Sequence, residues 1–421
     1  MKKILIMMGS YFPKPMANGI CTHQIALELK KNGYDVHVIC FNKSGDLKED
    51  TYEGIIIHRV KMRMFFRLRF YAEDNINTWK GKCIYKVAMI INKIKKLIYA
   101  PFYPMTSPIF IYRYYKLAKR LHKENNFDII ISVYNPLEAL IAGSMMKKKY
   151  KEINFAIYIL DTLSNSPKVK FLSKSWTEWK GWQWEKRIYK YADIIFNMKC
   201  HEEHHKKERY DKYIDKMKIV DIPLFTNFNN DTKQFCNPFD KYNIQWVYSG
   251  TLYLGGRDPE YLCKIFTELN NKYNNRLHFY SRGNCEHIII KYQDKSNDTI
   301  VRHGYVDRHE MLQAISYADI LISIGNQESD MIPSKIFEYI STGKKIIHFY
   351  KSFNDSSIVY YKDYANVLLI NENDNFFENI NAIKKFIYHK QNDILVDNLK
   401  KIYIKNTPEY TVNFIKKILE D

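Results

Sequence analysis

Continuous apolar runs alternate with helical patterns along this chain, and this alternation limits the folds that it can adopt. The predicted strands include residues 3–8, 127–133, 193–197, 276–280 and 319–324. The predicted helices include residues 20–31, a segment that begins at 137, and residues 310–318. Strands that are apolar throughout belong to parallel sheets that helices cover on both faces. We therefore predict an α/β protein whose ligands bind beyond the carboxyl ends of its strands.

The length and composition of the chain fit two domains. Its 421 residues, of which 46% are hydrophobic, can form two sizeable cores. A polar stretch follows the last predicted strand of the first half and marks a linker. We predict a first domain over residues 1–225, a linker over 226–241, a second domain over 242–400, and a C-terminal helix over 401–421 that can pack back on the first domain.

An acidic loop, a short helix and a buried strand are predicted late in the second domain. Pro333 suits the first position of a helix and Gly343 can close one, so we expect a helix over residues 333–342. Asp330 and Glu338 lie before and inside this helix. Both carboxylates can therefore address one ligand at its N-terminus, where free backbone amides favour a diphosphate such as that of a phosphorylated sugar. The alternative is an ordinary core helix with a solvated glutamate.

A glycine-bearing loop over residues 249–257 is predicted between a strand at 245–248 and a helix that Asp258 and Pro259 begin. The loop contains Gly250, Thr251, Gly255, Gly256 and Arg257. Glycines let a ligand approach the backbone closely, and the arginine can place two parallel hydrogen bonds on phosphate oxygens. The alternative is a plain strand-to-helix turn with an exposed arginine.

Two runs in the second domain resemble bacterial glycosyltransferases of the GT-B architecture, in particular family 4. They are Trp246 to Leu262, and Pro333 to Tyr339 followed by Thr342-Gly343-Lys344. The resemblance implies two Rossmann-like domains whose parallel sheets face an interdomain cleft. It also implies transfer of a sugar from a nucleotide-sugar with retention of the anomeric configuration.

The same resemblance implies roles for individual residues. Glu338 would bind the ribose hydroxyls, Asp330 would lie by the transferred sugar, and Arg257 would meet the pyrophosphate. The first acid is Asp where the family has Glu, and Glu328 competes with it for that place. The family needs no bound metal, so Arg257, Lys335 and the helix dipole would neutralise the leaving diphosphate. The remaining donor-binding candidates are Gly250, Thr251, Asn326 and Ser334.

The beginning of the chain resembles the acceptor-side domain of the same enzymes. Asn18 and Gly19 fall in a loop that would face the interdomain cleft, and His23, either packed or catalytic, lies on the helix after it. Tyr134 and Asn135 end a strand where many family members carry a histidine that touches the donor sugar. Both side chains can hydrogen-bond hydroxyl groups. The loop lacks a Gly-x-Gly-x-x-Gly pattern, which argues against a nicotinamide dinucleotide.

The positive charge is confined to the first half of the chain. Residues 1–230 hold 41 basic and 22 acidic side chains, whereas residues 231–421 hold 24 of each. Residues 61–120 alone hold 14 basic and 2 acidic side chains, interleaved with apolar and aromatic ones. Basic amphipathic segments bind anionic membrane surfaces, so we expect this region to rest on the membrane. The alternatives are a solvated basic face or a nucleic-acid site, and no nucleic-acid motif accompanies the patch.

Cysteine spacing and hydropathy suggest the compartment. The seven cysteines show no paired spacing, which indicates reduced thiols. We find no signal peptide and no run of about 18 apolar residues. We therefore expect a cytoplasmic protein, peripheral on the inner face of the cell membrane. Cys200 and His204 have the spacing of half a zinc site, but no second ligand pair accompanies them, so we predict no metal.

Together these patterns predict a glycosyltransferase. It would move a sugar from a UDP- or GDP-sugar to a glycan or lipid-linked acceptor in cell-surface polysaccharide synthesis. The alternatives are a nucleotide-sugar epimerase of the same fold, or a non-catalytic partner of similar shape that recruits others to the membrane. The sugar, the base and the acceptor stay open.

Overall fold

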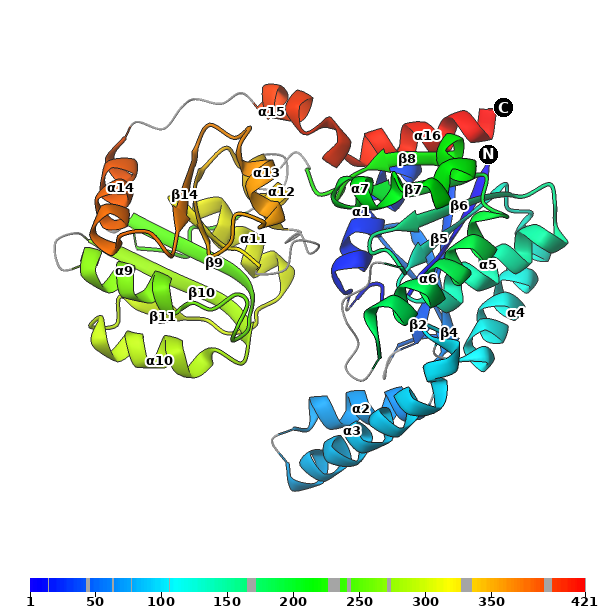
Figure 1. The fold of residues 1–421 in the computed structure, drawn as a ribbon, viewed down its shortest axis with the longest axis horizontal. Helices are drawn as coiled ribbons and strands as arrows, with labels where there is room; N and C mark the ends of the chain where they lie inside the picture. Colours follow the sequence, from blue (N-terminus) through cyan, green and yellow to red (C-terminus); the bar gives the residue numbers. More distant parts are fainter. Residues whose placement is uncertain are drawn as a thin grey trace. The chain divides into compact units, whose positions relative to one another are not determined.

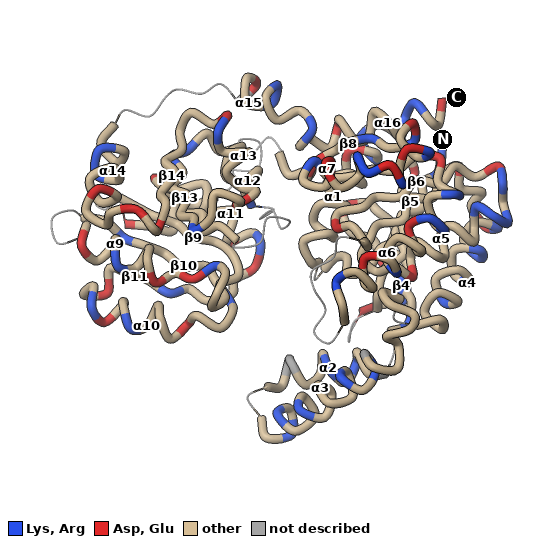
Figure 2. The backbone as a smooth tube through the Cα atoms, in the orientation of Figure 1, with Lys and Arg blue, Asp and Glu red and all other residues tan. Residues whose placement is uncertain are grey.

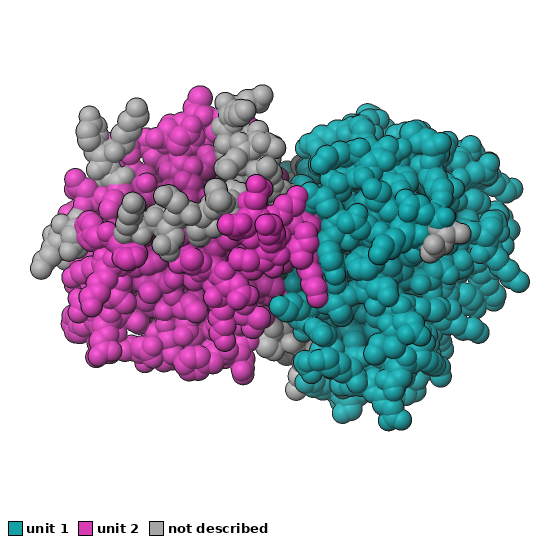
Figure 3. Space-filling view, turned by 90° about the horizontal axis from the view of Figure 1, so that it is seen from above, with its two compact units in different colours: residues 1–223, 408–421 teal, residues 224–407 magenta. Residues whose placement is uncertain are grey.

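The chain forms two compact units in the computed structural model (Figure 3). The structure describes residues 1–420 except 14, 43–45, 63, 77, 106, 165–171, 226–234, 241–243, 271–273, 327–334 and 390–395. Unit 1 comprises residues 1–223 and 408–421, and unit 2 comprises residues 224–407. Most of the predicted linker lies outside the described residues. The C-terminal segment therefore belongs to the first unit, although the whole second unit precedes it in sequence.

Unit 1 is built on an eight-stranded sheet with the order β3-β4-β2-β1-β5-β6-β7-β8. Its strands are β1 (Lys3–Met7), β2 (Asp35–Asn42), β3 (Glu49–Tyr52), β4 (Ile55–Lys61), β5 (Ile129–Tyr134), β6 (Asn154–Ile159), β7 (Ile194–Met198) and β8 (Met217–Val220). Every neighbouring pair is parallel except β3 and β4. Consecutive residues of β1 from Ile4 to Met7 are all fully buried. Because successive side chains point to opposite faces, both faces of this sheet are covered at β1.

The helices of unit 1 follow its strands in the chain (Figure 1). They are α1 (Ala17–Lys31), α2 (Met64–Asp74), α3 (Trp79–Tyr99), α4 (Pro108–Asn125), α5 (Leu137–Lys149), α6 (Lys174–Tyr189), α7 (Glu202–His205) and α16 (Pro408–Glu420). Helices α4 and α5 pack on each other, and α16 packs on α1. Helices α2 and α3 form a hairpin between β4 and α4.

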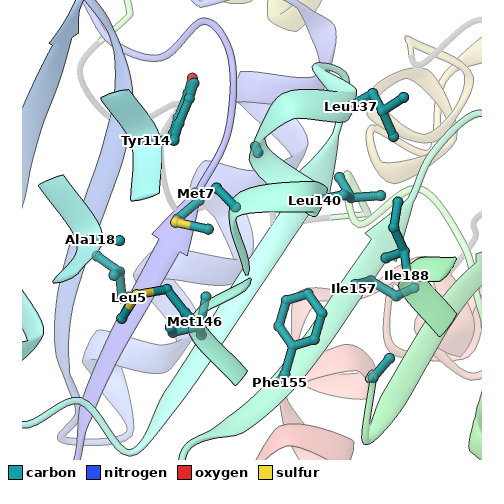
Figure 4. Packing of buried hydrophobic residues seen from close by; sticks show 14 of the residues in the cluster. Leu5, Met7, Tyr114, Ala118, Leu137, Leu140, Met146, Phe155, Ile157 and Ile188 are labelled. Carbon is teal, nitrogen blue, oxygen red and sulfur yellow. The ribbon is translucent and has the colours of Figure 1, made fainter. Parts of the chain in front are cut away.

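The core of unit 1 joins Leu5 and Met7 of β1 to α4 and α5 (Figure 4). Leu5 and Met7 pack in one cluster with Tyr114 of α4 and Phe155 of β6. The Tyr114 hydroxyl is buried there and donates a hydrogen bond to the Met8 carbonyl at 2.6 Å. The polar atom of this large core residue is therefore satisfied, as a buried hydroxyl requires.

Unit 2 is built on a six-stranded sheet with the order β11-β10-β9-β12-β13-β14, in which every pair is parallel. Its strands are β9 (Ile244–Leu252), β10 (Asn275–Gly283), β11 (Ile300–Arg302), β12 (Ile320–Ile324), β13 (Lys345–Tyr350) and β14 (Val367–Asn371). Its helices are α9 (Glu260–Asn270), α10 (Glu286–Lys295), α11 (Arg308–Tyr317), α12 (Lys335–Ser341), α13 (Ser356–Tyr361), α14 (Phe376–Tyr388) and α15 (Val396–Ile402). The predicted α/β class with parallel sheets is confirmed.

Two predicted boundaries are wrong in ways that affect candidate residues. Strand β9 extends to Leu252, so Gly250 and Thr251 lie in a strand and not in a loop. The cause is pairing with β10, which continues to Gly283 opposite Leu252. Helix α1 begins at Ala17, so Asn18 and Gly19 form its first turn and not the loop before it.

Candidate functional site

The candidate site lies at the carboxyl edge of the unit 2 sheet. Because all six strands are parallel, their carboxyl ends meet at one edge, which is where open α/β sheets bind ligands. Two contacts tie the chain after β12 to β9. One joins Arg257, in the loop after β9, to Asn326 after β12. The other joins the Ser249 amide of β9 to the Tyr339 hydroxyl of α12 at 3.0 Å.

Arg257 is held by a buried asparagine. Its Nε donates to Asn326 Oδ1 at 2.8 Å, and the Tyr253 hydroxyl donates to the same oxygen at 2.9 Å. The loop is closed by a bond from the Tyr253 amide to the Arg257 carbonyl, and Gly255 inside it has φ +76°, which favours glycine. Among the described residues, the two Nη groups of Arg257 have no hydrogen-bond partner. They keep the forked geometry that suits a phosphate.

Glu338 is a buried carboxylate between two cations. Its Oε1 accepts a hydrogen bond from Arg308 Nη2 at 2.7 Å, and its Oε2 lies 3.7 Å from Lys335 Nζ. Burial opposes ionisation, but Arg308 and Lys335 outweigh it, so the pKa of Glu338 lies below its usual value. Burial also lowers the pKa of Lys335, and Glu338 offsets part of that effect. Glu338 is therefore an oriented, ionised acceptor whose remaining lone pairs can receive hydroxyl hydrogens.

Three of the side chains described above are cationic. Arg257, Arg308 and Lys335 are cationic, and Glu338 balances one of them. Tyr339, buried in α12, anchors the same helix against β9, so Glu338 is set beside the carboxyl half of that strand. Such an arrangement can bind a polyanion through the arginine fork and hydroxyl groups through the carboxylate.

Several residues that were predicted to bind the donor either lie outside the described residues or have a different setting from the one expected. Asp330 and Ser334, with the competing Glu328, lie outside the described residues. Thr251 lies in β9, where its Oγ1 accepts a hydrogen bond from Arg282 Nε at 3.4 Å. Asn326 holds Arg257, an arrangement that the sequence patterns did not predict.

The structure adds residues to the site that the sequence did not predict. Arg308 begins α11, which was predicted to start at Glu310, and its pairing with Glu338 spans 30 residues. Its place just after β11 was the signal available, since that position lies at the ligand-binding edge. Tyr253 carried a similar signal, because it is an aromatic residue with a hydroxyl inside the glycine-bearing loop.

The candidates of unit 1 gather at the carboxyl ends of β1 and β5, two neighbouring strands. Asn18 Nδ2 donates to the Tyr134 carbonyl at 3.1 Å and so ties α1 to the end of β5. A side chain at Gly19 would place its Cβ 2.4 Å from the Ser10 carbonyl oxygen, so this close approach requires glycine. Asn135, the residue after Tyr134, is exposed.

His23 is buried among aromatic residues. Its Nδ1 lies 2.7 Å from the Tyr11 hydroxyl, and its Nε2 lies 3.2 Å from Glu53 Oε2. Its ring packs against Phe12 and Tyr52 with centroids 4.4 and 5.4 Å apart. In this structure His23 therefore links the loop after β1 to the turn between β3 and β4, as a packed histidine does.

No cluster of three or more metal-binding side chains is present among the residues that the structure describes. His204, whose spacing from Cys200 resembles half a zinc site, lies in a different setting: its Nε2 is 2.8 Å from both the Ser164 and Tyr210 hydroxyls. Glu185 completes this buried network by accepting from both hydroxyls. Burial, with neighbouring positive charge, lowers the pKa of His204 to about 3. His204 is thus a neutral member of a hydrogen-bonded core network.

Comparisons with known proteins place the fold. No protein-family model matches the chain, and no curated protein matches its sequence. A glycosyltransferase from Rickettsia africae has a TM-score of 0.63 at 12% identity, covering 100% of this chain and 99% of that one. A structure described as trehalose-6-phosphate from E. coli bound with UDP-2-fluoro glucose has a TM-score of 0.61 at 12% identity, covering 100% and 99%. UDP-GlcNAc 2-epimerase from Methanocaldococcus jannaschii has a TM-score of 0.59 at 12% identity, covering 99% of both chains.

These matches extend over the whole chain and over both units. With the two parallel sheets, they show that the chain has the GT-B fold. At 12% identity the likeness defines the fold alone, and function has to be argued from the site.

Proposed function

We propose that this protein is a glycosyltransferase that uses a nucleotide-sugar donor. The observation that carries the proposal is the presence of both an arginine fork, in the loop after β9, and an ionised carboxylate, in α12, which Tyr339 holds against β9. Arg257 offers its two Nη groups, and Glu338 is held ionised by Arg308 and Lys335. A nucleotide-sugar needs both chemistries, because it carries a diphosphate and a ribose diol.

The roles of the donor residues follow from their chemistry. Arg257 would hold the diphosphate and stabilise the charge that develops on it as the sugar leaves. Glu338 would accept the ribose hydroxyls, with Arg308 fixing the direction of its carboxylate. By resemblance to family 4, Asp330 or Glu328 would lie by the transferred sugar, and the reaction would retain the anomeric configuration. A UDP- or GDP-sugar fits this site, and its charge would be neutralised by protein cations without a metal.

The acceptor would be a glycan or a lipid-linked saccharide of cell-surface polysaccharide synthesis. The candidate acceptor residues lie at the carboxyl ends of β1 and β5. There Asn18 is bonded to the Tyr134 carbonyl and Asn135 is exposed. Amide and hydroxyl side chains are the groups that hydrogen-bond sugar hydroxyls.

The second candidate function is epimerisation of a nucleotide-sugar. It is favoured by the likeness to UDP-GlcNAc 2-epimerase, which covers as much of the chain as the likeness to the glycosyltransferase. Both reactions begin with a bound nucleotide-sugar, so the donor site would serve either. They differ in whether an acceptor takes part.

Donor binding is the first test. We expect a UDP- or GDP-sugar from a panel to raise the melting temperature, because a ligand at 100 times its Kd stabilises a protein by about 2.7 kcal/mol. Arg257→Lys keeps the charge but loses the fork, and we expect about tenfold weaker binding. Arg276→Lys is the matched control, because Arg276 is exposed near the amino end of β10, away from the candidate edge. Equal effects of Arg257→Lys and Arg276→Lys on donor binding would show that Arg257 does not bind the donor.

Product analysis with a radiolabelled donor then separates the reactions. Label in an acceptor supports transfer, and label in an isomeric nucleotide-sugar supports the epimerase. Recovery of unchanged donor across a panel of saccharide and lipid-linked acceptors, despite tight binding, would favour a non-catalytic protein.

A further inference from the structure

The α2–α3 hairpin carries an apolar stripe that the described residues of unit 1 leave exposed. Each of its residues exposes between 44% and 67% of its surface. The residues of this stripe are Val87, Ile90, Ile91, Ile94, Leu97 and Ile98 of α3. Their spacing of three and four places them on one side of the helix. Trp79, at the first turn of α3, is 77% exposed. A helix of a water-soluble domain normally turns such a stripe to its core.

The side of α3 that faces α2 is not the side that carries the apolar stripe. Helices α2 and α3 pack on each other, and Ala72 of α2 and Ala88 of α3 are buried. A side chain at Gly81 would meet the Asn75 carbonyl oxygen, so the start of α3 lies tightly against the end of α2. Lys95 extends over the Phe66 ring with its Nζ 5.3 Å from the centroid. Helix α3 therefore packs on α2 through one side, and its apolar stripe lies on another side that faces outward.

A row of exposed lysines borders the stripe. Lys82, Lys86 and Lys93 are exposed, and their spacing of four and seven residues lines them up along α3. Figure 2 shows basic residues along both helices of the hairpin. The sequence from residue 61 to 120 holds only two acidic residues, Glu73 and Asp74, at the end of α2. The outward side of α3 is thus both apolar and cationic.

We propose that the α2–α3 hairpin docks on an anionic lipid surface, with α3 lying in the plane of the interface. The stripe would enter the boundary between headgroups and acyl chains, and the lysine row would meet anionic headgroups. No helix among the described residues is long and apolar enough to cross a membrane. The exposed lysines favour an anionic surface as the binding partner, because each lysine near such a surface adds to the attraction.

The observations favour a lipid surface over other partners. A second copy of the hairpin would bring two lysine rows together with few acidic groups to pair them, and like charges repel. A nucleic acid would use the lysines but would leave six large aliphatic side chains in water. Helix α4 is left out of this surface, because Phe110, Tyr114 and Ala118 pack in the core of unit 1. Its only exposed large apolar residues are Ile109 and Tyr112.

Vesicle binding of the full chain tests the proposal. We expect flotation with vesicles of phosphatidylglycerol and phosphatidylcholine at low salt, weaker flotation at high salt, and little with phosphatidylcholine alone. Replacing Lys82, Lys86 and Lys93 by Gln should weaken partitioning about 100-fold, since each basic residue near the surface contributes about a factor of five. The matched control replaces Lys148, Lys151 and Lys174, which are exposed elsewhere in unit 1, and should bind nearly as the parent does.

The apolar stripe is tested separately. Ile90→Ser, Ile94→Ser and Leu97→Ser together should abolish flotation while the melting temperature stays within a few degrees, because these side chains are exposed. Cys83 lies four residues before Val87 on the same side of α3 and is exposed. A polarity-sensitive dye on Cys83, with Cys200 and Cys236 replaced by Ser, should shift to the blue on anionic vesicles and be quenched by lipids labelled in the acyl chain. A dye on Cys236 alone should not respond.

Three outcomes would overturn the proposal. The first is no flotation with anionic vesicles at low salt. The second is an equal loss of vesicle binding in the hairpin lysine variant and in the control lysine variant, which would show a general charge effect. The third is a dimer in lipid-free solution that the serine variant abolishes, with no response of the Cys83 dye to vesicles, which would assign the stripe to a second copy. These measurements need neither donor nor acceptor, so they stand apart from the proposed reaction.

Discussion

At the scale of single residues, Glu338 is the side chain that most sharply tests the proposed donor site. Its carboxylate is buried, and Arg308 and Lys335 hold it ionised. Hydrogen bonds to a charged acceptor are worth about 1.5–3 kcal/mol. We therefore expect Glu338→Gln to raise the donor KM about 10- to 100-fold with a smaller change in kcat, measured by initial rates. Glu338→Ala should act more strongly and also lower stability, because it removes the carboxylate that two cations contact.

Arg308→Gln separates binding from packing. Arg308 is half-exposed and contacts Glu338 without reaching the ribose in the proposed arrangement. Its replacement should raise the donor KM less than Glu338→Gln does. If Glu338→Gln lowers the melting temperature but leaves the donor KM unchanged, the carboxylate is a structural ion-pair partner.

His204 is predicted to make stability depend on pH. Its pKa in the folded protein is about 3, below the value of about 6.5 for an unfolded chain. The folded state therefore binds fewer protons in this window, and the free energy of unfolding falls as pH drops from 6.5 toward 3. The loss contributed by His204 approaches about 1.4 kcal/mol per pH unit.

His204→Gln removes that proton site. We expect urea unfolding of the variant to show a weaker decline in stability between pH 6.5 and 4 than the parent shows. His287→Gln, at an exposed position of α10, controls for the loss of a histidine. Equal pH slopes in parent and His204→Gln proteins would contradict the prediction.

At the scale of elements, α16 shows how the end of the chain stabilises the beginning. It packs on α1, and Phe414 meets the ring of Phe196 in β7 with centroids 6.2 Å apart. Lys416 Nζ donates to Asn32 Oδ1 just after α1. The last helix is therefore part of the core layer of unit 1, and the chain has to return to this unit after completing unit 2.

Ile415 tests this packing, because it is 1% exposed in α16. Ile415→Ala should lower the free energy of unfolding by about 2–4 kcal/mol, the usual cost of a large-to-small change in a core. Lys417→Ala, two residues on and exposed, should change it by less than about 0.5 kcal/mol. Thermal unfolding of the full chain measures both, and comparable effects would mean that α16 does not support the core.

At the scale of the whole molecule, much of the architecture was predictable because periodicity is local. Apolar runs such as Ile320 to Ile324 are buried on both faces only in covered parallel sheets, and the structure places that run in the interior of the unit 2 sheet. Boundaries were less predictable, because pairing sets them. Strand β9 continues to Leu252 since β10 continues beside it, and neither segment alone carries that information.

The candidate site was predictable in part for the same reason. Arg257 and Glu338 stand out by residue type and by their place after a strand or within a short helix. The contacts that hold these two side chains could not be predicted without the fold. Asn326 contacts Arg257 across 69 residues of sequence, and Arg308 contacts Glu338 across 30. Side chains so far apart in sequence meet only because parallel strands bring their carboxyl ends to one edge.

The amino-acid sequence by itself determined the α/β class and the strongly basic, amphipathic character of residues 61–120, and it led us to expect two domains. These are properties of composition and of short-range periodicity. Only the tertiary structure decided which side of α3 faces outward, that His23 and His204 are packed in hydrogen-bonded networks, and that Glu338 is held between two cations. Burial and ion pairing depend on which distant segments meet, and that is a property of the folded chain alone.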